Sequence, residues 1–236
     1  LNLCIDKIFR HDLCKQLNAI VTFSNDTVIF GQRTIRISNG IDFSSIPLRQ
    51  QIHTMENELH LIGVAEIHFW HGFDRIINGL KENYTQNPTY KVYFHIVGNL
   101  SGERERQEIE MPIHTYGLSP YVILHGAKHG KELDVLFEKA DFAVGSLARH
   151  RSGIQNIKTL KNREYAARGF GFIYSETDDD FEKMPYILKA PADETPIEIS
   201  KVIAFCKKQT TPPQEIRDSI RNLSWKEQMK KVYDSI

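Results

Sequence analysis

Three short segments of the chain combine glycine with histidine, lysine and arginine, residue types that bind phosphate groups. They are "HFWHG" at 68–72, "HGAKHGK" at 125–131 and "ARHRSG" at 148–153. Glycine lets the backbone approach a ligand closely, so that backbone N–H groups and nearby cations both reach phosphate oxygens. The pattern predicts a diphosphate-bearing ligand. It does not favour a dinucleotide dehydrogenase, because no GxGxxG follows the first long strand that we expect.

A fourth segment, "LKNREYAARG" at 160–169, carries Glu164 between basic neighbours. A carboxylate can accept hydrogen bonds from two vicinal hydroxyl groups, and charged acceptors make the stronger bonds. The same residue also suits the amino end of a helix, where a negative charge contributes roughly 0.3 to 1 kcal/mol. The residues alone leave both interpretations open.

The elements that must position these side chains alternate along the chain. We expect strands at 59–65, 90–98, 121–126, 141–147 and 171–175, and helices at 72–84, 103–117, 131–140 and 160–169. Such alternation is typical of right-handed crossovers and of a doubly wound parallel sheet in an α/β fold. Ligands of such sheets bind at the carboxyl ends of the strands, where the four segments above would lie.

The flanking regions differ from this pattern. Short extended segments are expected at 19–24, 27–30 and 34–38, and helical stretches at 213–222 and 224–236. We therefore divide the chain into residues 1–57, a Rossmann-like domain at 58–210, and carboxyl-terminal helices at 211–236.

Composition excludes several classes of function. Thirty basic and thirty acidic residues cancel, so the bulk charge does not favour a nucleic-acid partner. No apolar run approaches the roughly 20 residues of a membrane span. The cysteines, Cys4, Cys14 and Cys206, form no CxxC pair, which suits a reducing compartment and predicts a cytoplasmic protein.

The sequence does not favour a metal site. The pairs His68/His71 and His125/His129 lack a nearby cysteine or a zincin-like glutamate. The acidic run "ETDDD" at 176–180 is expected to be a solvated loop. We therefore expect neither a metal nor another cofactor.

Several phrases together resemble a known family. "WHGFDRIINGL", "VYFHIVG", "YVILHG", "KELDVLFEKADFAVGSL" and "LKNREYAARG" occur in an order and spacing similar to the donor-binding, carboxyl-terminal half of GT-B glycosyltransferases of the family-four type, especially polysaccharide-assembly members. "TIRISNGID" resembles the interdomain crossover. The resemblance implies a nucleotide-diphosphate sugar bound between two Rossmann-like domains, and sugar transfer with retention of configuration, normally without a metal ion.

The resemblance also implies roles for particular residues. Glu164, five residues before Gly169, matches the family glutamate that binds the donor ribose. The loop at Gly126 would lie beside the base. The diphosphate would be bound by a set of loop residues and nearby cations, for which the candidates are His71, Gly72, Arg151, Ser152, Gly153, Lys158 and Lys161. His71 and Arg151 are the candidates for a catalytic role.

Departures from the family pattern affect the same site. Asn156 stands where the first motif glutamate is expected, and Glu66 and His71 replace the usual arginine and lysine after the first strand. A replacement cation would come from Arg151, Lys158 or Lys161. The missing glutamate also favours a catalytically silent binding module, which the intact "LKNREYAARG" argues against.

These implications define the expected function. The chain would be the donor-binding part of a retaining glycosyltransferase that serves a polysaccharide or lipid-linked glycan acceptor in capsule, exopolysaccharide or other surface-glycan assembly. A nucleotide-sugar epimerase of the same architecture is the alternative enzyme.

We expect a second domain before residue 1, which would bring peripheral association with the inner face of the membrane. The stripe of Trp225, Met229, Val232 and Tyr233 would either face that domain or pack on its own domain. The base, the sugar, the acceptor and the oligomeric state are left open.

Overall fold

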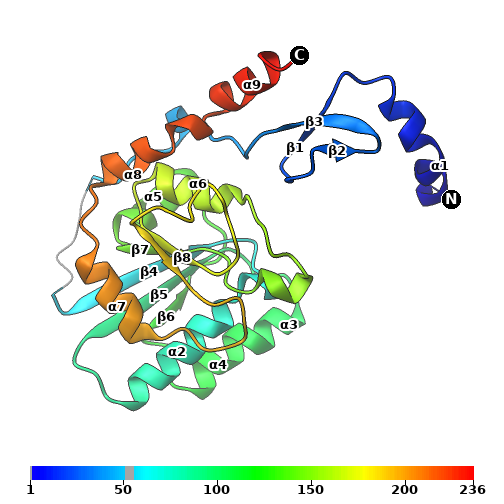
Figure 1. Cartoon of the computed structure of the whole chain (residues 1–236). Coiled ribbons are helices and arrows are strands. Elements are labelled where there is room, and N and C mark those ends of the chain that lie inside the picture. The colour runs from blue at the N-terminus through cyan, green and yellow to red at the C-terminus, as the bar shows by residue number, and fades with distance from the viewer. Residues whose placement is uncertain (1, 51–55) are drawn as a thin grey trace.

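The computed structural model describes residues 2–50 and 56–236, and its centre is a six-stranded parallel sheet (Figure 1). The strand order is β6-β5-β4-β7-β8-β9, so the direction of winding reverses between β4 and β7. This order confirms the predicted doubly wound α/β fold. The strands are β4 (Glu58–Val64), β5 (Lys91–Val97), β6 (Val122–Leu124), β7 (Phe142–Val144), β8 (Phe172–Tyr174) and β9 (Ile187–Lys189).

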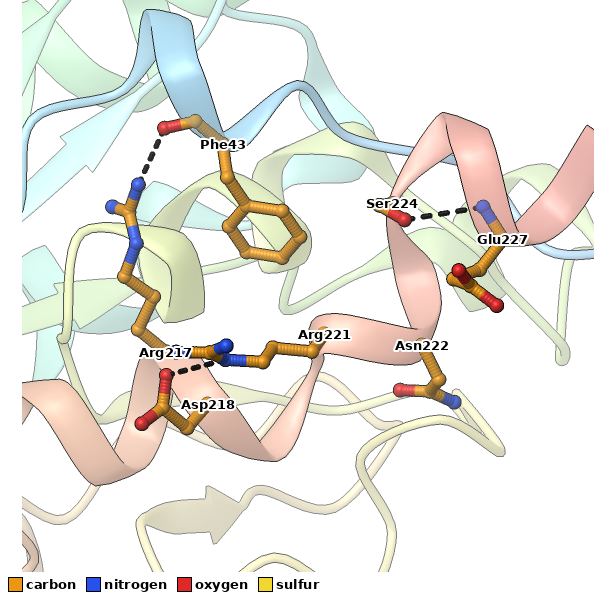
Figure 2. A pocket seen from close by; sticks show the side chains of 7 residues that line it. All are labelled: Phe43, Arg217, Asp218, Arg221, Asn222, Ser224 and Glu227. Atoms are coloured by element: carbon orange, nitrogen blue, oxygen red, sulfur yellow. Dashed lines mark hydrogen bonds and ion pairs between the residues drawn. The ribbon is translucent and has the colours of Figure 1, made fainter.

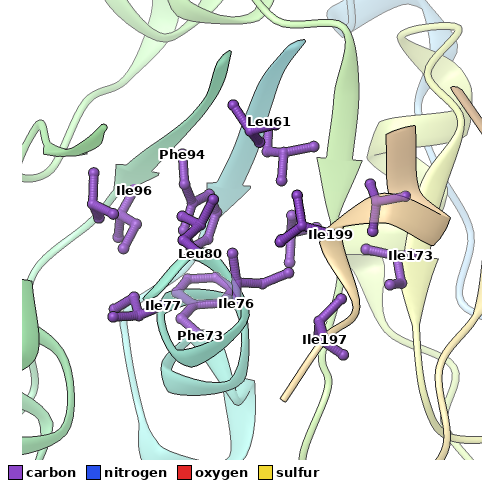
Figure 3. Packing of buried hydrophobic residues seen from close by; sticks show 14 of the residues in the cluster. Leu61, Phe73, Ile76, Ile77, Leu80, Phe94, Ile96, Ile173, Ile197 and Ile199 are labelled. Carbon is purple, nitrogen blue, oxygen red and sulfur yellow. The ribbon is translucent and has the colours of Figure 1, made fainter. Parts of the chain in front are cut away.

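Helices cover both faces of this sheet. Neighbouring residues of β4 show why: Leu61 belongs to one buried cluster and Ile62 to the other, because alternate side chains of a strand point to opposite faces. In Figure 3 the apolar side of α2, with Phe73, Ile76 and Leu80, packs beneath β4 and β5. The helices around the sheet are α2 (Phe73–Thr85), α3 (Glu103–Glu105), α4 (Met111–Thr115), α5 (Gly130–Glu138), α6 (Leu160–Ala167), α7 (Ile199–Lys208) and α8 (Pro213–Ser219).

The sequence located most of these elements but missed two of them. β9 and α7 were not predicted, because "YILK" is a very short apolar run and α7 follows a proline-rich loop. The helix expected at 103–117 exists, but a π-helical turn at Arg106–Glu110 interrupts it between α3 and α4. None of these three elements, β9, α7 and the π-helical turn, directly follows β4 or β7.

A smaller unit precedes the main sheet. It consists of α1 (Asn2–Cys14) and a three-stranded sheet of β1 (Ile20–Thr22), β2 (Val28–Ile29) and β3 (Gln32–Arg36), in the order β1-β3-β2. Figure 1 shows it set apart from the main body, on the same side as the last helix, α9 (Trp225–Tyr233). Two hydrogen bonds join these parts: Arg33 donates to the carbonyl of Ser235, and Ser38 N–H donates to the side chain of Gln228.

Other sequence expectations concern cysteines and the membrane. Cys14 and Cys206 are both buried and free, whereas the side chain of Cys4 lies outside the described part of the structure. Among the described residues, no helix combines the length and apolar character that a membrane crossing requires.

Candidate functional site

The loops that follow β4 and β7 meet at Gly72. This residue has φ of +66°, and a Cβ added to it would lie 2.8 Å from Cβ of Ala148. The N–H of Leu147 donates to the carbonyl of His71 at 2.9 Å, and this hydrogen bond holds the two loops together. Only glycine tolerates both the backbone angle and the close contact. The "HFWHG" and "ARHRSG" segments are therefore neighbours at the point where the winding of the sheet reverses.

Lys161, in the first turn of α6, brings an amine to this junction. Its Nζ is buried and has no hydrogen-bond partner among residues 2–50 and 56–236, although the residue as a whole is partly exposed. The amine lies 5.4 Å from the ring centroid of Phe73, the first residue of α2. Burial, together with the positive charge of Arg149, lowers the pKa of Lys161 to about 7. Such an unpartnered amine is suited to an anionic ligand.

His71 is a neutral imidazole rather than a cation. Its Nδ1 accepts a hydrogen bond from the N–H of His68 at 3.0 Å, which places the ring proton on Nε2. Burial, with smaller effects from Lys161 and Arg149, lowers the pKa of His71 to about 2. We expected His71 to donate to a phosphate when protonated; the structure instead makes it a neutral donor through Nε2–H.

Arg149 is the third basic side chain of the junction, and the sequence did not single it out. Its Nε is buried without a hydrogen-bond partner in the described part of the chain, and its guanidinium lies 5.4 Å from the ring of Trp70. Its backbone N–H donates to the carboxylate of Glu176. We call Lys161, Arg149 and His71 the basic cluster.

Further unpartnered polar atoms lie at the neighbouring strand ends. They are buried, and no hydrogen bond to them is made within residues 2–50 and 56–236: Oγ of Ser146, Oγ of Ser175, Oδ1 of Asn162 and Oε2 of Glu176. Ser146 follows β7, Ser175 and Glu176 follow β8, and Asn162 is in the first turn of α6. Buried polar groups normally find partners, so their concentration here marks a site completed by water or a ligand. The sequence did not reveal the two serines, because the expected strands include Ser146 and Ser175, whereas β7 and β8 end one or two residues earlier.

Arg151, by contrast, is fully engaged within the protein. Its guanidinium binds Asp74 in α2 through two hydrogen bonds of 3.0 and 2.7 Å, and it also binds Glu194. Although burial opposes it, hydrogen bonding to these two carboxylates raises the pKa of Arg151. Next to it, the Ser152 hydroxyl donates to the carbonyl of Arg149, and Gly153 is exposed with φ of +71°.

Lys158 is also paired, and it belongs to a different cavity. Its Nζ binds Asp180 at 3.1 Å. The cavity, of about 450 Å³, lies between the turn after β1 and the loops after β7 and β8. Its lining includes Phe23, Asp26, Arg36, Asn156, Lys158 and Asp179. Asn156, which replaces the expected motif glutamate, therefore lines a polar cleft between the smaller unit and the main sheet.

Glu164 lies on α6 with one carboxylate oxygen engaged. Oε1 accepts from Nε of Arg168 at 3.0 Å, and the side chain is 33% exposed. Arg168 in turn binds Asp134 of α5. The other carboxylate oxygen accepts no hydrogen bond from the described residues, so it is available to a hydroxyl donor.

The loop after β6 places Gly126 at the same edge of the sheet. The N–H of Gly98 donates to the carbonyl of Gly126 at 2.8 Å, and a Cβ added to Gly126 would meet no atom within 4 Å. Just before it, His125 ends a chain of imidazoles: His60 contacts His95, and His95 contacts His125, each with nitrogens 2.9 Å apart. The chain runs diagonally across β4 and β5 to the end of β6.

A cavity of about 510 Å³ lies elsewhere, between the crossover and the terminal helices (Figure 2). Its lining includes Phe43, Arg217 and Arg221. The guanidinium of Arg217 donates to the carbonyls of Ile46, Ala167 and Phe43, and Arg221 donates to Asp218. Both arginines are therefore engaged in holding α8 and the crossover, and this cavity contains none of the predicted site residues.

The acidic run at 176–180 is not the solvated loop that we expected. Glu176 and Asp178 are buried, and Asp178 binds the buried guanidinium of Arg163 at 2.8 Å. The expectation failed because Arg163, fifteen residues away in the sequence, is brought against the run by α6. Within the described residues, no group of three or more His, Cys, Asp or Glu side chains is arranged to hold a metal ion.

Comparison with solved structures defines the class of fold. The parallel sheet and its helices form a Rossmann-like domain as found in GT-B glycosyltransferases. The chain is similar to a glycosyltransferase from Rickettsia africae, with a TM-score of 0.72 at 13% identity over 98% of this chain and 65% of that one. For sucrose-phosphate synthase from Thermosynechococcus elongatus the TM-score is 0.68 at 15% identity, over 96% and 60% of the two chains.

A third similar structure was solved with a nucleotide. Anabaena HepE in complex with UDP has a TM-score of 0.69 at 14% identity, over 95% of this chain and 66% of that one. The chain thus spans about 60 to 66% of these three solved chains. No protein-family model and no curated protein matches the sequence. At these identities the similarity establishes the fold.

Proposed function

We propose that this chain is the donor-binding part of a retaining glycosyltransferase that uses a nucleotide-diphosphate sugar. The observation that carries the proposal is the basic cluster, in which a buried amine with no hydrogen-bond partner among the described residues lies beside Arg149 and His71. The cluster lies just after the carboxyl ends of β4 and β7, where the winding reverses and where doubly wound sheets bind ligands. A diphosphate would supply oxygens that accept hydrogen bonds from these basic side chains.

With the diphosphate at the basic cluster, the ribose and the base of the donor can also be assigned to residues. We assign the ribose to the free carboxylate oxygen of Glu164 and the base to the loop at Gly126. Lys161 takes the place of the arginine and lysine that the family has after its first strand, because Arg151 and Lys158 are neutralised by carboxylates. Ser152 and Gly153 would shape the loop, and Gly72 would let the backbone approach the phosphates.

Sugar transfer itself needs stabilisation of the charge that develops on the leaving diphosphate. Fixed donors aimed at that charge are the largest contribution in many enzymes. Here the donors are the Lys161 amine, the Arg149 guanidinium and Nε2–H of His71. We place the transferred sugar and its acceptor toward the cleft lined by Asn156 and Asp26. The glycan acceptor would belong to surface-polysaccharide assembly.

A second domain would complete the enzyme. The smaller unit and α9 expose large apolar side chains, including Phe9 at 60%, Leu13 at 66% and Tyr233 at 84%. Trp225 and Met229 are also exposed, as expected for a stripe that is not covered by its own domain. We propose that the acceptor-binding Rossmann-like domain covers these surfaces and extends the β1-β3-β2 sheet.

Titration calorimetry with UDP, GDP and inorganic pyrophosphate tests the donor site. We expect at least one nucleotide to bind, with or without a chelator. Lys161→Met should weaken binding about 10- to 100-fold, as for the loss of a charge-assisted hydrogen bond. Lys158→Met is the matched control and should change affinity little. Absence of binding by the wild-type chain, or equal losses in both variants, would contradict the proposal.

A catalytically silent binding module is the second candidate function, and Asn156 is the observation that favours it. An amide stands in the cleft where the family has a catalytic-site glutamate. Product analysis with UDP-sugars distinguishes the outcomes. Transfer to an acceptor or to water indicates a glycosyltransferase, a changed sugar configuration indicates an epimerase, and binding without turnover indicates the silent module.

A further inference from the structure

We infer that, at pH 8 and above, the Lys161 amine is uncharged in the empty site and that binding of the nucleotide diphosphate adds close to one proton to it. The inference rests on the proposed donor site but concerns a different property, the linkage of ligand binding to protonation. The Lys161 amine would thus be neutral in the ligand-free protein at this pH and an ammonium in the complex.

The surroundings of the amine explain its neutral form. Nζ of Lys161 is buried without a hydrogen-bond partner in the described part of the chain, and the nearest aromatic surface is the ring of Phe73. An ammonium in such a place loses its hydration without gaining acceptors, so the uncharged amine is favoured. Because the residue is partly exposed while its amine is buried, the side chain folds inward from the surface.

One charged group near the amine adds to the effect of burial. The loop after β7 contributes the cation Arg149, which lowers the pKa of Lys161 beyond the effect of burial, to about 7. The loop after β4 contributes His71, which is neutral, and α2 contributes the apolar Phe73. In the loop after β8, Oε1 of Glu176 accepts from the N–H groups of Arg149 and His150, and no hydrogen bond joins Glu176 to Lys161 among the described residues.

A bound diphosphate favours the charged form of the Lys161 amine. Its oxygens supply both the acceptors and the negative charge that the empty site lacks, and an adjacent negative charge raises the pKa of an amine. At pH 8 a free amine with a pKa of about 7 is about 10% protonated, so binding should take up about 0.9 proton. Above pH 8 the apparent affinity should fall about tenfold per pH unit.

Calorimetry of UDP binding at pH 8, in two buffers with different ionisation enthalpies, measures the proton uptake. UDP is suited to this pH because its terminal phosphate, with a pKa of about 6, is already deprotonated. The expected result is uptake of about 0.9 proton by the wild-type chain. Lys161→Arg, which is permanently charged, should bind UDP with little uptake and with nearly constant affinity from pH 7 to 9. Binding by the wild type without uptake would overturn the inference while leaving the donor site intact.

Competitive acetylation of the ligand-free chain provides a test that needs no nucleotide. The reactivity of the Lys161 amine should titrate with a midpoint near pH 7, about three units below the usual value for an exposed lysine side chain. A midpoint near 10.4 would overturn the inference on its own. If the wild type binds neither UDP nor pyrophosphate, the proposed function fails, and the linkage to ligand binding fails with it.

Discussion

The guanidinium of Arg151 forms a two-point ion pair with the carboxylate of Asp74, at 2.7 and 3.0 Å, which joins the loop after β7 to the first turn of α2. The two side chains are only 11% and 16% exposed. Arg151, which the sequence predicted to bind the diphosphate, is therefore neutralised by a carboxylate of the protein itself.

Arg151→Met should destabilise the fold by about 2 to 4 kcal/mol, because it leaves Asp74 partly buried without its partner. Denaturant unfolding measures the change. Arg221→Met removes an exposed pair, with side chains 73% and 41% exposed, and should cost less than about 1 kcal/mol. A stability loss for Arg151→Met no larger than for Arg221→Met would contradict the structural role. A large loss of UDP affinity in Arg151→Met, with unchanged stability, would indicate that Arg151 binds the donor after all.

Glu164→Gln should weaken nucleotide binding about 10- to 150-fold, since hydrogen bonds to charged groups are worth about 1.5 to 3 kcal/mol. Stability should change by less than about 1 kcal/mol, because the Glu164–Arg168 pair is a partly exposed i,i+4 contact. Calorimetry of UDP and GDP measures the first effect and thermal unfolding the second. Glu198→Gln, at the residue just before α7, is the control. Equal affinity of Glu164→Gln and wild type would leave Glu164 as a helix-end charge.

The imidazole chain predicts acid sensitivity. Burial, together with His60 and His125, lowers the pKa of His95 to about 4. Below pH 6.5 the unfolded chain binds a proton at this residue while the folded chain does not, so stability is lost as the pH falls from about 6.5 toward 4. His95 alone should account for roughly 1 to 2 kcal/mol between pH 6.5 and 5.

Unfolding of His95→Gln at the two pH values tests this assignment. The variant should lose less stability on acidification than the wild type, even if it is less stable at pH 7. His129→Gln, at an exposed loop position, should follow the wild-type profile. Parallel profiles for the wild type and His95→Gln would show that the acid sensitivity arises elsewhere, for which His71 is the next residue to replace.

Gly40 and Trp225 determine how α9 sits on the crossover. A Cβ added at Gly40 would lie 2.3 Å from Cδ2 of Trp225, so Gly40→Ala must displace the indole. We expect a loss of about 1 to 3 kcal/mol and a red shift of Trp225 emission, measured in a Trp70→Phe background. Gly102→Ala, whose added Cβ would approach only the Glu105 carboxylate at 3.3 Å, is the control. Unchanged emission and stability for Gly40→Ala would place α9 away from the crossover.

The sequence by itself determined the class of fold and the general location of the site. Alternating apolar segments predicted five of the six strands of the main sheet, because each buried strand is a short apolar run between amphipathic helices. The glycine-and-cation segments were correctly expected at the carboxyl ends of these strands, since that placement follows from chain order alone in a parallel sheet. β9, with only three residues, gave too weak a signal.

Only the tertiary structure decided which cations are free. Arg151 and Lys161 look equivalent in the sequence, yet Arg151 meets Asp74 and Glu194, which are 77 and 43 residues away, whereas the Lys161 amine meets no acceptor among the described residues. Arg163 and Asp178 likewise form a fully buried pair that no sequence pattern indicated. Charge neutralisation and burial depend on contacts between distant segments, and these set both the pKa of a side chain and its availability to a ligand. Local sequence patterns carry no information about such contacts.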